Sequence, residues 1–218
     1  MAAKGKSPST TRAQILRVAG RLFGSCGVEA VGIRRIAREA GVNLASINYH
    51  FGSKEALFRE ICADHLSQIN VRRHALLDAA VARGAKMSVE DVLEAFVRPS
   101  IEFAHSRDES NALLVQLFMQ QIHSGDNALE RVLIEAEQPA VRRFLAELAR
   151  LLPEIPKRRL VAGFSHFAGS ALHAIAHARV SSLIAGKELT PLSGAATVES
   201  LVSFGAGGLR ALQSLSRK

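Results

Sequence analysis

The sequence predicts an all-α fold of about nine helices, and three observations favour it. Ala, Leu, Arg and Glu are abundant while Trp is absent and Tyr occurs once, which is the composition of helices rather than strands. Apolar residues recur three and four positions apart, which is the period of an α-helix. Gly and Pro residues interrupt this pattern where helices are expected to end.

Cysteine content and hydropathy limit the class of protein. Cys26 and Cys62 form no C-x-x-C pair, so neither a disulfide framework nor a zinc knuckle is predicted. No stretch reaches the roughly 18 apolar residues of a membrane span, and the first residues lack the apolar segment of a secretory signal. We therefore expect a cytoplasmic protein with no membrane partner.

The first two helices are predicted from their apolar faces. The first is capped by Thr10 or Thr11 and ends at Gly27, and the second ends at Gly41. Arg34, Arg35 and Arg38 lie on the outer face of the second helix. The inward positions of the two helices are Ile15, Leu16, Ala19, Leu22, Phe23, Ile33, Ile36, Ala37 and Ala40.

A third, short helix follows a tight turn. Gly41 supplies a left-handed backbone, Val42 fills the gap between the flanking helices, and Asn43 caps a helix over residues 44–51. Ile47 and Phe51 face inward, which leaves the other side chains outside. A helix of about eight residues is about 12 Å long and fits the major groove of DNA. Residues 31–50 are thus predicted to form a helix-turn-helix.

The exposed set has the chemistry of a DNA reader. Asn48 can pair with adenine, Ser46 can meet any base, and Ala45 or Leu44 can touch a thymine methyl group. After Gly52, Ser53 caps the next helix, and the free N–H groups at the start of that helix lie beside Lys54. A helix start of this kind is suited to bind phosphate. The residues predicted to hold DNA are Arg34, Arg35, Asn43, Leu44, Ala45, Ser46, Asn48, Tyr49, His50 and Lys54, with Tyr49 and His50 on phosphates.

The charge distribution agrees with a polyanionic partner. The net charge is +8; residues 1–60 hold ten Lys and Arg against four Asp and Glu (+6), and the remaining residues hold eighteen against sixteen (+2). Basic side chains that neutralise phosphates release condensed counterions. Double-stranded DNA is therefore the predicted partner.

The stretches TRAQILRVAGRLF and IRRIAREAGVNLASINYHFGSKEALF resemble the N-terminal DNA-binding domain of the tetracycline-repressor (TetR) family over residues 9–60. The resemblance implies a dimeric regulator whose C-terminal domain, here residues 61–218, binds an effector and so releases the operator. Two positions depart from the family. It often has Thr capping the second helix and Tyr within the third, where this chain has Gly32 and Asn48. The form VNLASINYHFGSK is similar to fatty-acid-responsive repressors, so a fatty-acyl effector is one expectation.

The larger domain is predicted as a series of helices. One runs from Glu55 toward Val81. Ser88 opens the next in a near capping box with Asp91, and Pro99 lies inside it as a kink. Three further helices cover residues 111–123, 127–152 with a bend at Pro139, and 157–186, and a last one covers 197–215.

The last two helices are rich in small residues, which let helices approach closely. They are predicted to form a four-helix bundle with a second subunit, through Gly163, Ala171, Ala174, Ala178, Gly205 and Gly208. A homodimer places two reader helices about 34 Å apart, so the operator is predicted to be palindromic.

The effector site is predicted from aromatic and long apolar side chains. Few charges converge on them, so the ligand is predicted to be a small apolar or amphipathic molecule. Side chains at this spacing also occur as plain core. The set comprises Phe96, Phe103, Phe118, Met119, Ile122, Phe164 and Phe167.

The alternatives are a metal-responsive regulator and an enzyme. His166, His173 and His177 share one helix, and the last two are four apart as in some metal sites, but no Cys, Asp or Glu completes the set. The segment from Gly163 to Phe167 lacks the glycine and the strand of a nucleophile elbow. No cofactor signature occurs. The prediction is a homodimeric, ligand-released repressor and not an enzyme.

Overall fold

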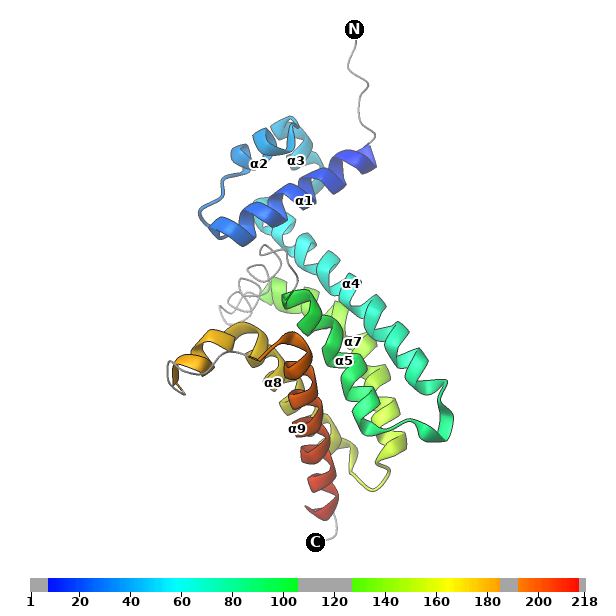
Figure 1. Cartoon of the computed structure of the whole chain (residues 1–218). Helices are drawn as coiled ribbons and strands as arrows, with labels where there is room; N and C mark the ends of the chain where they lie inside the picture. The colour runs from blue at the N-terminus through cyan, green and yellow to red at the C-terminus, as the bar shows by residue number, and fades with distance from the viewer. Residues whose placement is uncertain (1–7, 106–126, 185–191, 216–218) are drawn as a thin grey trace. The chain divides into compact units, whose positions relative to one another are not determined.

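The structure, a computed structural model, describes residues 8–105, 127–184 and 192–215 (Figure 1). These residues form eight α-helices and one short 3-10 helix, with no strand among them, which confirms the all-α prediction. The chain divides into two compact units. Of the described residues, 8–66 and 127–133 belong to the first unit, and 67–105, 134–184 and 192–215 belong to the second. The helix predicted over 111–123 lies outside the described residues.

The first unit begins with three helices, α1 (Pro8–Cys26), α2 (Ile33–Ala40) and α3 (Leu44–Phe51). The chain is already helical at Pro8, so the predicted cap at Thr10 or Thr11 is wrong. Proline suits a first helical turn because its φ is fixed near the helical value and the missing N–H would have no partner there. The predicted ends at Gly27 and Gly41 are confirmed.

These helices bury one apolar cluster with the start of α4 (Lys54–Val81). All the predicted inward positions belong to it, and only Leu16 and Ile33 are partly exposed. Phe23 on α1 meets Phe58 on α4 edge to face, with ring centroids 5.8 Å apart. Arg12 on α1 pairs with Glu60 on α4. This packing gives α2 and α3 a fixed platform.

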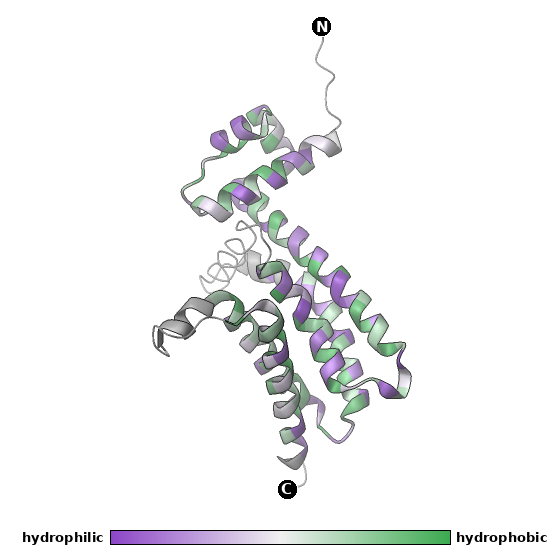
Figure 2. Ribbon diagram, viewed as in Figure 1, coloured by the Kyte–Doolittle hydropathy of each residue, from purple (hydrophilic) through white to green (hydrophobic). Residues whose placement is uncertain are grey.

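Helix α4 is long enough to belong to both units. Figure 2 shows hydrophilic and hydrophobic colours alternating along it, and its two ends contribute side chains to two different buried clusters. The predicted domain boundary after residue 60 falls inside this helix. It ends at Val81, before η1 (Gly84–Lys86), close to the breaker predicted at Gly84.

The second unit also contains α5 (Val89–Ala104), α7 (Asn127–Leu151, from residue 134), α8 (Lys157–Ile184) and α9 (Gly194–Leu215). Ser88 and Asp91 form a full capping box: Asp91 N donates to Ser88 Oγ at 3.2 Å and Ser88 N donates to Asp91 Oδ2 at 2.8 Å. Pro99 and Pro139 lie inside α5 and α7. Side chains from α4, α5, α7, α8 and α9 share one buried apolar core.

Two glycines predicted to face a second subunit instead pack inside this unit. A methyl group at Gly163 would lie 2.7 Å from Leu212 Cδ1 and 2.8 Å from Leu209 Cδ2, both on α9. A methyl group at Gly205 would overlap Phe167 and lie 3.1 Å from Leu93 Cδ1. The prediction is therefore wrong for these two residues, because their lack of a side chain lets α9 approach α8 and α5 of the same chain. It is also wrong for Ala171, which is buried in the same core. No described helix is both long enough and apolar enough to cross a bilayer.

Candidate nucleic-acid interface

The link between α2 and α3 has the geometry of a helix-turn-helix. Gly41 adopts φ 61° and ψ 38°, a left-handed conformation that costs glycine little because it has no Cβ. Val42 N donates to Ala37 O at 3.0 Å, and its side chain packs on the buried cluster. Asn43 Oδ1 then accepts from Ala45 N at 3.0 Å, so the predicted cap is confirmed. The turn thus fixes where α3 begins and which face it turns outward.

Helix α3 presents a polar and aromatic face. Ile47 and Phe51 are buried, whereas Ala45, Asn48 and Tyr49 are exposed. Tyr49 is 84% exposed and meets His50 edge to face, with centroids 5.1 Å apart. The remaining predicted contacts, Leu44, Ser46 and His50, are half-buried. Leu44 also packs on the core, so its contact with a base would use only the part of the side chain left outside.

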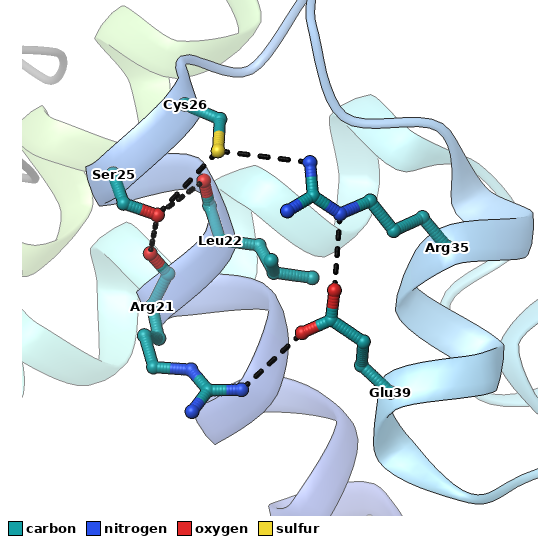
Figure 3. Close-up of polar contacts among 6 residues, drawn as sticks. All are labelled: Arg21, Leu22, Ser25, Cys26, Arg35 and Glu39. Carbon is teal, nitrogen blue, oxygen red and sulfur yellow. Dashed lines mark hydrogen bonds and ion pairs between the residues drawn. The ribbon is translucent and has the colours of Figure 1, made fainter.

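Arg35 is held in a polar network that joins α2 to the end of α1 (Figure 3). Its Nε donates to Glu39 Oε1 at 3.0 Å and its Nη1 donates to Cys26 Sγ at 3.7 Å. Arg21 Nη2 donates to the other Glu39 oxygen at 3.3 Å. The Glu39 carboxylate, followed by Cys26, raises the pKa of Arg35. Its side chain is 42% exposed and remains open to an anion.

The sequence prediction missed Arg21, Cys26 and Glu39 in this network. The four-residue spacing of Arg35 and Glu39 on one helix was the available signal. The contact with α1 had no local signal, since it depends on how the two helices pack. Arg34 and Arg38, by contrast, are exposed on α2 as predicted.

Lys54 differs from the free phosphate ligand that the sequence suggests. Its Nζ donates to Val28 O at 3.1 Å and lies 3.6 Å from Glu29 Oε2, and the side chain is only 21% exposed. Ser53 Oγ accepts from Ala56 N at 3.1 Å, so one N–H of the helix start is also used. The observed role of Lys54 is therefore structural, because it connects the link between α1 and α2 to the start of α4.

Comparisons with known proteins fit this geometry. The profile described as "Bacterial regulatory proteins, tetR family" matches residues 15–61, and "Tetracyclin repressor-like, C-terminal domain" matches residues 94–208, more than half of the chain. The chain belongs to the TetR family. Members of this family are DNA-binding transcription factors and not enzymes.

Curated TetR-family relatives match part of the chain. The HTH-type transcriptional repressor KstR2 of Mycolicibacterium smegmatis is 32% identical over 81 residues, which are 37% of this chain and 40% of that protein. The HTH-type transcriptional regulator AcrR of Shigella flexneri is 40% identical over 90 residues, 41% of each chain. The matches thus span about two fifths of the relatives' length.

Solved TetR-type structures match nearly the whole fold. The fatty acid degradation regulator FadR of Bacillus halodurans superposes with a TM-score of 0.65 over 90% of this chain and 98% of that chain, at 17% identity. This likeness establishes the fold of both units.

The predicted effector residues fall in the second unit where they are described. Phe96, Phe164 and Phe167 are buried together in its core, and Phe103 is half-buried near the end of α5. Phe96 lies edge to face with Phe164 and with Phe144, with centroids 4.8 and 5.2 Å apart. Phe118, Met119 and Ile122 lie outside the described residues.

The histidines of the metal alternative lie on α8. His166 and His173 are exposed, and the side chain of His177 is outside the described part. Within that part, no three His, Cys, Asp or Glu side chains are placed to hold a metal ion. The described residues therefore give no support to the metal-responsive alternative.

Proposed function

We propose that this chain is a homodimeric transcriptional repressor that binds a palindromic operator and is released by a small amphipathic effector. The observation that carries the proposal is the outward face of α3, which Asn43 caps and the Gly41 turn orients. Residues 9–60 would bind DNA, and residues 61–218 would bind the effector and the second subunit. The repressor named KstR2 among the relatives supports repression rather than activation.

Operator recognition would divide between bases and phosphates. Asn48, exposed in the middle of α3, can form two hydrogen bonds with adenine, and Ala45 can contact a thymine methyl group. Tyr49, His50, Arg34 and Arg35 would meet phosphates, which position the helix without reading sequence. Lys54 would add positive charge while its Nζ stays bonded to Val28 O.

The second subunit would meet the outer faces of α8 and α9. Val161 and Leu172 on α8 are 40% and 41% exposed, and Phe204 on α9 is 68% exposed. Beside Phe204, a methyl group at Gly207 or Gly208 would meet nothing within 4 Å, so this part of α9 is open to a close neighbour. Apolar surface of this kind is favoured at the centre of homodimer interfaces. A dimer formed here would pair two α3 helices for a two-fold operator.

The effector would be bound among the aromatic side chains of the second unit. Phe96, Phe164 and Phe167 form a buried aromatic cluster and Phe103 is half-buried, and the similarity of VNLASINYHFGSK to fatty-acid-responsive repressors favours acyl ligands. Linkage then requires that an effector weakening DNA binding itself binds the DNA complex more weakly, by the same factor.

The experiment is selection of bound duplexes from a random DNA pool, followed by titration of the best duplex against salt. A palindromic consensus with half-sites about one DNA turn apart, or slightly more, supports the proposal. Weak binding that depends only on salt, without a consensus, refutes it.

A further inference from the structure

Arg73 is a buried cation at the edge of the second unit's core. Only Asn70 and Arg73 are buried polar residues in the described part of the chain, and the Arg73 side chain is 8% exposed. Burial of a guanidinium is unfavourable unless anions and acceptors surround it. The groups around Arg73 therefore indicate which chemical class of ligand this site could bind.

Four hydrogen bonds hold the guanidinium. Nε donates to Phe96 O at 2.9 Å, Nη1 to Asn70 Oδ1 at 3.0 Å and to Glu137 Oε2 at 2.6 Å, and Nη2 to Ser100 Oγ at 3.0 Å. A guanidinium has five N–H donors. Among the backbone groups and side chains that the structure describes, no acceptor is found for the second N–H of Nη2. An unused donor on a buried guanidinium points to an oxygen-bearing ligand.

Two proline-containing helices provide this polar site. Phe96 O lies three residues before Pro99 on α5, and Ala136 O, which accepts from Asn70 Nδ2 at 2.9 Å, lies three residues before Pro139 on α7. Both carbonyls lie within a helix and accept from a side chain of α4, Phe96 O from Arg73 and Ala136 O from Asn70. Three acceptors thus hold the guanidinium independently of Glu137: Phe96 O, Asn70 Oδ1 and Ser100 Oγ.

The anion that now pairs with Arg73 is less buried than its partner. The Glu137 side chain is 23% exposed against 8% for Arg73. It can therefore move toward water, where its charge is solvated, if another carboxylate takes its place. Exchange of one carboxylate for another leaves no unpaired charge in the core, whereas a neutral group in that place would leave one.

The opposite side of the site is aromatic. Arg73 Cζ lies 4.0 Å from the centroid of the Phe96 ring, whose own neighbours are Phe144, Phe164 and Phe167. A molecule that places an acidic group on Arg73 would meet this aromatic cluster with its apolar part. A ligand that fits both the Arg73 cation and the aromatic cluster would be an amphipathic anion.

We propose that Arg73 is the anchor for the effector, and that the effector is an apolar molecule carrying a carboxylate. This inference rests on the proposed function and adds to it the chemical class of the ligand. The carboxylate accepts from the free Nη2 N–H and displaces Glu137 from Nη1, which gives the two-bond geometry that guanidinium and carboxylate favour. No covalent step is involved.

The test is calorimetric titration of the full chain with dodecanoate below its micelle concentration, with 1-dodecanol and dodecylammonium as neutral and cationic counterparts. We expect the acid to bind at least about tenfold more tightly than either counterpart, since only it can replace Glu137. Glu137→Gln should tighten dodecanoate binding several-fold, because the competing carboxylate is gone. Arg73→Gln should abolish the preference for the acid, and Arg72→Gln, an exposed neighbour on α4, should leave it unchanged.

The opposite signs of the two core variants separate a ligand anchor from a merely structural ion pair. Circular dichroism checks folding; if Arg73→Gln does not fold, Glu137→Gln in the folded chain still decides. Weaker dodecanoate binding by Glu137→Gln, equal binding of acid and alcohol, or no dodecanoate binding by the wild-type chain overturns the inference. If any of these three outcomes occurs and the proposed function is right, the chain still binds its selected operator. If the proposed function is wrong, no operator is selected.

Discussion

At the residue scale, Asn48 and Lys54 are expected to contribute to DNA binding in different ways. Asn48→Ala should relax the preference at one base pair, at a cost of about 1–3 kcal/mol for the preferred base. Lys54→Ala should weaken binding to all sequences alike and flatten the salt dependence. The measurement is affinity for the selected operator and its single-base variants at several salt concentrations. Equal behaviour of the two variants would contradict this division.

The structure adds a control for Lys54 that the sequence did not suggest. Its Nζ is bonded to Val28 O, so part of any loss comes from a loosened domain rather than a lost phosphate contact. A hydrogen bond from a charged donor such as this ammonium contributes about 1.5–3 kcal/mol to stability. Thermal unfolding of Lys54→Ala without DNA separates the two effects.

The two cysteines should react at different rates. The Ser25 hydroxyl and, after it, the Arg35 guanidinium lower the pKa of the exposed Cys26 thiol, whereas burial raises the pKa of Cys62 to about 12 (Figure 3). Thiolate is the reactive form, so iodoacetamide should label Cys26 in the folded chain and Cys62 only after denaturation. The labelling rate of Cys26 should rise with pH around a midpoint below the ordinary value.

Ser25→Ala is the matched control for this prediction. Removal of the hydroxyl that contributes most to the lowered pKa should shift the midpoint upward without exposing Cys62. A pH profile for Cys26 that does not change on this substitution would show that Ser25 does not stabilise the thiolate.

At the scale of elements, the two glycines that flank α2 should respond oppositely to substitution. Gly32 caps α2 with φ −80° and ψ 146°, makes no side-chain cap bond and has open space around a Cβ. Gly32→Ser should therefore supply the missing acceptor and stabilise the fold by about 0.3 kcal/mol, since glycine is itself a fair N-cap. Gly41→Ala should destabilise it by about 1–3 kcal/mol, because a side chain disfavours positive φ. Chemical denaturation measures both, with Gly32→Ala as the control that adds a methyl group but no acceptor.

Sequence reasoning succeeded for elements whose signals are local. Asn43, Gly41 and the Ser88–Asp91 box act within a few residues, so their roles can be inferred from the order of amino acids alone. Contacts between distant helices have no such signal. In NVRRH, nothing distinguishes the buried Arg73 from the exposed Arg72, because the difference depends on where α5 and α7 pack.

The same limit explains the glycines of α8 and α9. A row of small residues predicts that helices approach closely, but it does not say which helix fills the space. Gly163 and Gly205 receive side chains of their own chain, and Gly208 remains open. Only the packed structure separates internal from external contacts.

At the scale of the whole molecule, the open part of α9 predicts which substitution disrupts the dimer. Phe204 is 68% exposed, and a buried aromatic side chain at the centre of an interface often contributes more than 2 kcal/mol to association. Phe204→Glu should therefore shift the chain toward monomer at micromolar concentration, as measured by light scattering, with unchanged helical content. Val71 on α4 is 67% exposed, so Val71→Glu removes similar apolar exposure and should leave the dimer intact.

The monomer should also lose affinity for DNA in a specific manner. A two-fold operator is bound through two α3 helices, so a chain that cannot pair retains the contacts of one half-site only. Phe204→Glu should then bind a full operator hardly better than a half-site, while Val71→Glu keeps the difference. If Phe204→Glu remained dimeric and retained full operator affinity, the interface would lie elsewhere than on the outer face of α9.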